Sequence, residues 1–250
     1  MFLILGFFLS MIIGVSLGLI GGGGSIITVP VLVYVLDVDP RQAIGMSLAV
    51  VGATSLIGAF LHAKKGSVAG KTGVVFGSSG VVGAYWGSQM TYLVSPTVLM
   101  LLFAALMVVI GILMLVRKFP AAEDQSRQPV QLTKALGAGF VVGGLTGFLG
   151  VGGGFLIVPA LLLFGGLPMK EAVGTSLLVI AINCAAGLFG HLHQSIFDLR
   201  LAFLVTSFAV TGTLVGSMLA SHTSPMRLRM GFAVFVISVA VFLIAKNSIV

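Results

Sequence analysis

Two glycine-rich segments contain the residues whose chemistry best fits the binding of a small anion. The first comprises Gly21, Gly22, Gly23, Gly24 and Ser25, and the second comprises Gly150, Gly152, Gly153 and Gly154. Each segment lies between apolar runs, so we expect a break in helix at membrane depth. Backbone N–H groups and the positive end of a helix dipole at such a break can hold an anion. Close helix packing is the alternative, and it explains Gly14-x-x-x-Gly18 and Gly83-x-x-x-Gly87 better than four consecutive glycines.

A stripe of polar residues follows each glycine segment and offers uncharged hydrogen-bond donors. The first stripe comprises Ser47, Thr54, Gly58 and His62, whose spacings of seven, four and four residues place them on one helix face. The second comprises Ser176, Asn183, Gly187 and His191 at the same spacings, with Thr175 beside Ser176. These side chains can donate hydrogen bonds to an anion, and Ser47 and Ser176 lie nearest the glycine segments. Hydrogen bonding between helices explains the stripes equally well.

His62 and His191 are the candidates for a coupling proton, because histidine titrates near physiological pH. A capping role, or a position among lipid headgroups, is the alternative that the sequence favours. The pair His191 and His193 has no cysteine or carboxylate cluster to complete a metal site, so we predict no metal and no other cofactor. The six acidic residues fall in loops or at segment ends. The sequence therefore predicts neither paired catalytic carboxylates nor a cation pathway, and no enzyme activity.

The chain is an internal duplication with a constant offset of 129 residues, which separates Gly21 from Gly150 and Pro30 from Pro159. The same register pairs Gly45 with Gly174, Gly58 with Gly187, His62 with His191, Gly83 with Gly212, Gly87 with Gly216 and Pro96 with Pro225. Chance does not hold one register over so many glycines, prolines and histidines. We predict a first repeat over residues 1–116, a linker over 117–133 and a second repeat over 134–250.

Composition places the protein in a membrane. Of its 250 residues, 58% are hydrophobic and only 8% are charged, whereas a soluble domain has about 25% charged residues. The mean hydropathy is +1.21. The net charge of +7 comes from basic residues in short loops, which is typical of membrane topology rather than of a nucleic-acid partner. We therefore expect a lipid bilayer around a polytopic chain, and no nucleic acid.

The apolar segments predict an all-α protein with about five helical segments in each copy. Ile26 to Leu36 and Phe155 to Phe164 are too short to cross a bilayer alone, and the sequence leaves open whether they cross or turn back. Short, glycine-interrupted segments at matching positions in two halves are typical of transporter binding sites.

Basic residues predict the orientation. One set of loops holds Lys64, Lys65, Lys71, Arg117, Lys118, Arg127, Lys134, Lys170, Arg227 and Arg229, and the other holds only Arg41, Arg200 and Lys246. Lys and Arg favour the cytoplasmic side, so we predict a cytoplasmic linker and both termini outside. Lys64 and Lys65 correspond to His193 and Gln194 in the second copy, as expected if equivalent loops face opposite sides. The prediction is two inverted-topology repeats, with short broken helices at the pseudo-two-fold axis.

Taken together, the chain resembles the TauE/SafE family of sulfite and organosulfonate exporters. The resemblance rests on the two glycine turns with their following prolines, and on Ala43-x-Gly45-x-Ser47 and Ala172-x-Gly174-x-Ser176. It covers nearly all of the chain except the linker. It implies an inner-membrane secondary transporter that exports small sulfur-containing anions by alternating access. A passive anion channel, or a transporter of another anion or a metal cation, remains the alternative, and a homo-oligomer is left open.

Overall fold

The structure is a computed structural model that describes residues 2–90, 96–116, 132–149, 154–191 and 198–247. Within these ranges the chain forms ten α-helices and no strand. The helices are α1 (Phe2–Ile20), α2 (Gly23–Tyr34), α3 (Pro40–Lys64), α4 (Gly70–Met90), α5 (Pro96–Val116), α6 (Leu132–Leu149), α7 (Gly154–Leu163), α8 (Met169–His191), α9 (Leu199–His222) and α10 (Pro225–Asn247). The all-α prediction, with five helical segments in each half, is confirmed.

Helix boundaries repeat with the offset found in the sequence. The starts of α3, α4 and α5 precede those of α8, α9 and α10 by the same 129 residues. Most of the predicted linker lies outside the described residues, and α6 begins at Leu132, two residues before the predicted start of the second repeat at residue 134. One pair of residues that keeps the register in the sequence, Pro96 and Pro225, also begins the helices α5 and α10.

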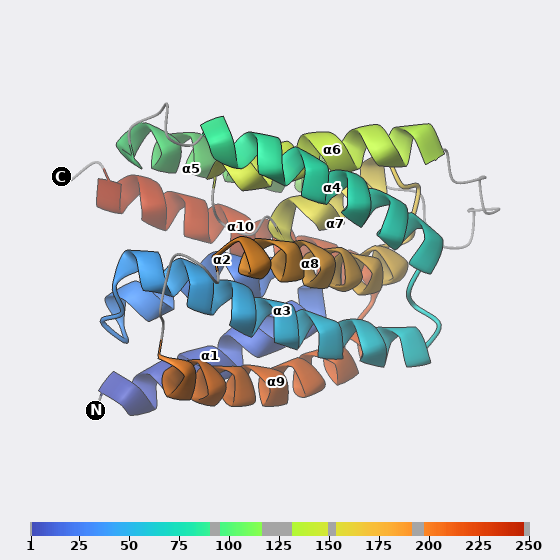
Figure 1. Cartoon of the computed structure of the whole chain (residues 1–250). Helices are drawn as coiled ribbons and strands as arrows, with labels where there is room; N and C mark the ends of the chain where they lie inside the picture. Colours follow the sequence, from blue (N-terminus) through green and yellow to red (C-terminus); the bar gives the residue numbers. More distant parts are fainter. Residues whose placement is uncertain (1, 91–95, 117–131, 150–153, 192–197, 248–250) are drawn as a thin grey trace.

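The first two helices form a hairpin. A Cβ atom on Gly24 would lie 2.5 Å from the carbonyl oxygen of Ile13, and a Cβ on Gly6 would meet the side chain of Leu36. The 12 residues of α2 therefore run back along α1 for about 18 Å. The first residues of α1 and of α3 lie at the same end of the bundle (Figure 1). The segment Ile26 to Leu36 thus turns back alongside α1.

Two of the most extensive helix interfaces join different halves of the chain, α1 with α9 and α4 with α6. Gly14 and Gly18 of α1 lie directly against the carbonyl groups of Ala209 and Thr213 of α9, where any Cβ atom would overlap the backbone. The corresponding glycines between α4 and α6 are Gly83, Gly87, Gly143 and Gly147. The packing interpretation of the two G-x-x-x-G motifs is confirmed, because only glycine allows this approach.

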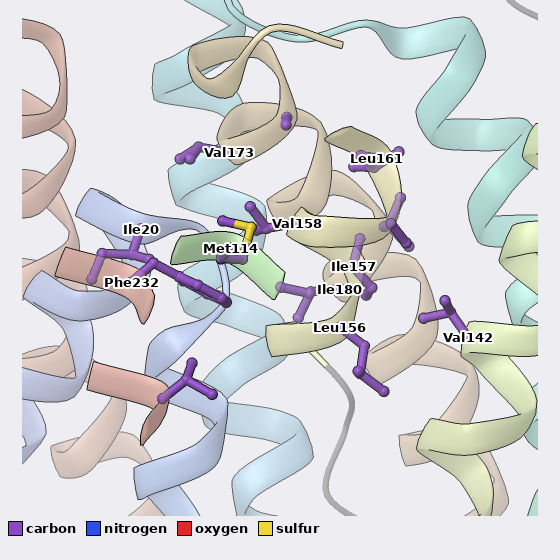
Figure 2. Close-up of a cluster of buried hydrophobic side chains, with 14 of the residues drawn as sticks. Ile20, Met114, Val142, Leu156, Ile157, Val158, Leu161, Val173, Ile180 and Phe232 are labelled. Carbon is purple, nitrogen blue, oxygen red and sulfur yellow. The ribbon is translucent and has the colours of Figure 1, made fainter. Parts of the chain in front are cut away.

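The core gathers around α7 (Figure 2). Leu156, Ile157, Val158 and Leu161 of this helix are all buried. The surrounding buried side chains are Ile20 of α1, Met114 of α5, Val142 of α6, Val173 and Ile180 of α8, and Phe232 of α10. A helix that is apolar all round belongs in the interior of a protein or in a membrane, so α7 is held by contacts on every side.

Three of the described helical segments are long and apolar enough to cross a membrane: Gly45–Lys64, Met169–Leu188 and Leu199–Ala220. Shorter apolar stretches occur at Leu5–Ile20, Gly23–Val33 and Ala104–Val116. Large apolar side chains such as Phe8, Phe60 and Phe203 are more than half exposed on the outside of the bundle. Exposed apolar surface of this extent marks contact with a membrane.

Candidate functional site

The first glycine segment is part turn and part helix. Gly21 has a φ of +79°, in the left-handed region that glycine favours, and α2 already begins at Gly23. Gly22 is the N-cap of α2, and no side chain caps this helix start. The whole segment from Gly21 to Ser25 is buried. The first N–H groups of a helix have no hydrogen-bond acceptor within the helix. At this buried and uncapped start, a bound solute could accept hydrogen bonds from them.

The start of α7 meets the start of α2. A Cβ atom on Gly154, the first residue of α7, would lie 2.7 Å from Ser25 Oγ and 3.1 Å from the carbonyl oxygen of Gly22. Each helix N-terminus carries a partial charge of roughly +0.5. Two such ends in contact inside the protein make this point electropositive. The predicted residues Gly150, Gly152 and Gly153 lie outside the described residues.

Ser176 of α8 ties the second half to the first glycine turn. Its Oγ lies 2.7 Å from the carbonyl oxygen of Gly21 and 2.7 Å from that of Val173. A hydroxyl has one hydrogen to donate, so the two carbonyls share it. Ser25 donates similarly to the carbonyl of Gly22, at 2.9 Å. Ser25 and Ser176, two of the three predicted serines, therefore lie at the turn, where they shape its backbone.

Ser16 is a residue that the sequence analysis missed. Its Oγ lies only 2.6 Å from where a Cβ of Gly23 would be, next to the start of α2. Ser16 is 9% exposed, and its hydroxyl has no hydrogen-bond partner among the described residues. The ring of Phe235 from α10 covers the same point, 3.0 Å from that Cβ position. The hydroxyl of Ser16 is thus an unused donor beside the uncapped helix start.

Two predicted threonines form hydrogen bonds with the backbone. Thr54 Oγ1 donates to the carbonyl oxygens of Val50 and Val51 in its own helix, at 2.6 and 3.1 Å. Thr175 Oγ1 accepts a hydrogen bond from the backbone N–H of Ala69, at 2.9 Å. Thr175 therefore fixes the connection between α3 and α4 to α8.

Ser47 is buried, and Asn183 lies apart from the first turn. Ser47 is buried in α3 at 9% exposure. Asn183 faces α4, because a Cβ on Gly80 would lie 3.5 Å from both atoms of its amide group. Seven residues of helix separate Asn183 from Ser176, which corresponds to about 10 Å. One small anion at the turn does not reach both side chains.

His62 lies close to the turn. It is in the last turn of α3, and its Nε2 lies 3.1 Å from the carbonyl oxygen of Gly18, about one helical turn before Gly21. The ring is buried, with 5% of its surface exposed. His191 ends α8 as the sequence predicted, and its side chain lies outside the described residues. The described residues contain no group of three or more potential metal ligands.

The chain matches the family model described as "Sulfite exporter TauE/SafE" over residues 6–243. The chain belongs to the TauE/SafE family. Among its TauE/SafE-like relatives, a "Probable membrane transporter protein" of Xylella fastidiosa (strain 9a5c) is 35% identical, covering 94% of this chain and 92% of the relative. The "Probable membrane transporter protein YdhB" of Bacillus subtilis (strain 168) is 30% identical, covering 82% of this chain and 85% of the relative. No solved structure matches the chain.

Membership of the TauE/SafE family identifies the protein as a helical membrane protein of a transporter family rather than of an enzyme class. In this TauE/SafE chain, the glycine turn, the start of α7 and the hydroxyl of Ser16 converge inside the bundle. The helix starts carry partial positive charge and Ser16 is a donor without a partner among the described residues, while the carbonyl oxygens of Gly21 and Gly22 already accept from Ser176 and Ser25. The chemistry of the site suits a negatively charged solute.

Proposed function

We propose that this protein is a secondary transporter that exports small sulfur-containing anions such as sulfite and sulfonates. The anion binds where the N-termini of α2 and α7 meet. The observation that supports this most strongly is the buried, uncapped start of α2, with the unpaired hydroxyl of Ser16 beside it. An acceptor that enters the site would give these groups a hydrogen-bond partner.

The electrostatics favour an anion over a cation. Backbone donors and helix ends stabilise negative charge without a fixed cation, and hydrogen bonds to a charged group contribute about 1.5–3 kcal/mol each. The described acidic residues Asp37, Asp39, Glu171 and Asp198 lie in connections or within the first turn of a helix. A cation pathway usually contains an acidic residue at membrane depth.

We infer that residues 1–116 and 134–250 are inverted repeats that move relative to each other during alternating access. The reciprocal pairing of helices supports this. The pair α1 and α9 becomes the pair α6 and α4 when the two halves are exchanged, and both pairs are among the most extensive interfaces. The hairpins of each half meet at the starts of α2 and α7. The buried position of Gly21 to Ser25 suits a carrier, in which the occupied site is closed from both sides.

The distribution of charge supports the predicted orientation. Lys65 at the end of α3 and Lys170 at the start of α8 line the same pocket, which also includes Leu228, between Arg227 and Arg229 of α10. The first residues of α1 and the last of α10 lie at the opposite end of the bundle (Figure 1). Because Lys and Arg favour the cytoplasm, we place the lysine end inside and both termini outside, in the bacterial inner membrane.

Replacing Ser16 by alanine should weaken anion transport while leaving the empty protein at least as stable. Loss of one hydrogen bond to a charged solute, about 1.5–3 kcal/mol, corresponds to a rise of roughly 10- to 100-fold in the half-saturation concentration. The hydroxyl has no hydrogen-bond partner among the described residues, so its removal leaves no described polar group without a partner. The measurement is radiolabelled sulfite flux in proteoliposomes, together with the thermal unfolding temperature.

Ser10→Ala is the matched control. Ser10 is also buried in α1, but its hydroxyl donates to the carbonyl oxygen of Gly6 in the same helix, at 2.7 Å. We expect Ser10→Ala to change flux less than twofold, since the lost hydrogen bond lies one helix turn or more from the glycine turn. Equal flux in the Ser16→Ala variant and the unaltered protein would exclude Ser16 from the site.

A further inference from the structure

A second electropositive site lies at the lysine end of the bundle. A small pocket of about 20 Å³, part of it open to the surroundings, is lined by His62, Lys65, Ser67, Lys170, Val173, Ala220 and Leu228. These residues come from α3, the connection after it, α8, α9 and α10. The pocket therefore combines both halves of the chain, as the glycine turn does.

The lining of the pocket has one sign of charge and one apolar wall. Lys65 and Lys170 are the basic residues of the lining, and none of the described residues that line the pocket is acidic. Lys65 is held in place because its Nζ donates to the carbonyl oxygen of Ser217 in α9, at 2.9 Å. The apolar part of the lining consists of Val173, Ala220 and Leu228. Such a lining fits a small oxyanion that carries a short alkyl group.

The pocket and the glycine turn share residues. Val173 lines the pocket, and its carbonyl oxygen would lie 2.8 Å from a Cβ on Gly21. His62 also lines the pocket and contacts the carbonyl of Gly18, in the turn of α1 that leads to Gly21. Val173 and His62 thus line the pocket and also lie beside the glycine turn and the end of α1.

We propose that this pocket is an entry site, where a small organic anion with a sulfonate-type head binds before it passes Val173 to reach the glycine turn. The assignment rests on the proposed function and adds a second, cytoplasm-facing anion site to it. Clefts lined by one sign of charge raise the local concentration of the opposite ion, with on-rates higher by about 10- to 1,000-fold. An exporter gains from such a site because its substrate is dilute in the cytoplasm.

The test is equilibrium binding of radiolabelled methanesulfonate to the purified full-length protein, with stoichiometry measured at low and high salt. We expect two sites in the unaltered protein. The double variant Lys65→Gln/Lys170→Gln should lose one site together with most of the salt dependence, and Ser16→Ala should lose the other. Lys65→Arg/Lys170→Arg keeps both charges and should keep both sites. Lys64→Gln is the matched control, because Lys64 Nζ lies over the ring of Phe60, 4.6 Å from its centroid, and does not line the pocket.

The variants separate this proposal from the proposed function. Unchanged stoichiometry and salt dependence in a folded Lys65→Gln/Lys170→Gln protein would overturn the entry site and leave the glycine-turn site intact. Loss of a site in that variant, with Ser16→Ala unaffected, would support the entry site and count against the turn. A lipid phosphate has similar chemistry, so binding is repeated in nanodiscs of neutral and of anionic lipid. Displacement of the lysine-dependent site by anionic lipid alone would assign the pocket to a lipid headgroup and overturn its role in entry.

Discussion

Replacing Gly21 by alanine should reduce sulfite flux in proteoliposomes by about 100-fold, which is the effect of moving binding groups by roughly 1 Å. The added Cβ would lie 2.6 Å from Ser176 Oγ and within 2.9 Å of the backbone of Val173. The backbone of α8 gives way less readily than a flexible side chain, so the turn must shift. A shift of Gly21 carries the N-terminus of α2 away from its position beside Gly154.

Gly66→Ala separates this effect from backbone strain. Gly66 has a φ of +68°, close to that of Gly21, and a Cβ there would meet no atom within 4 Å. Both variants therefore carry a similar left-handed strain of about 1–2 kcal/mol, but only Gly21→Ala disturbs the site. We expect Gly66→Ala to retain most of its flux. A comparable loss of flux in both variants would show that strain alone accounts for the effect.

Replacing Gly143 by alanine should destabilise the fold by about 3 kcal/mol, the upper end of the usual cost of overpacking. Gly143 of α6 lies directly against the backbone of Gly80 in α4, so a Cβ would overlap the carbonyl oxygen of that residue. The two helices must separate, and their interface is among the most extensive in the protein. Thermal unfolding of the detergent-purified protein measures the change.

Gly137→Ala is the matched control, on the same helix. Gly137 is exposed, and a Cβ there would meet nothing within 4 Å. Alanine in place of glycine within a helix stabilises by roughly 0.5–1 kcal/mol, so this variant should unfold at a higher temperature. If both substitutions changed the unfolding temperature in the same direction, the close contact between α4 and α6 would not exist in solution.

Most of what could be predicted about the fold came from the constant offset between the two halves of the sequence. Gly, Pro and His recur in one register, and helix starts in the structure follow the same spacing. The choice of helix partners was not predictable. A stripe of glycines such as Gly14 and Gly18 shows that a backbone comes close, but it does not say that the neighbour is Ala209 in the other half.

The candidate site was predicted only in part. The glycine turn, Ser25 and Ser176 come together, although the spacing had associated Ser176 with the second glycine segment. The stripe as a whole does not come together at the turn. Helical periodicity places residues on one face of a helix but at different levels along its axis. Asn183 lies about 10 Å along α8 from Ser176 for that reason. Ser16 was missed because its flanking glycines were interpreted as packing residues, and only the hairpin shows that it faces Gly23.

The most direct test is the location of a bound anion by anomalous diffraction, with crystals of the protein soaked in selenite, the selenium analogue of sulfite. We predict a selenium peak between the starts of α2 and α7, with its oxygens about 3 Å from Ser16 Oγ and from the first N–H groups of α2. Selenium peaks at other places, with none between these helix starts, would contradict the central claim that the two glycine-flanked helix ends hold the transported anion.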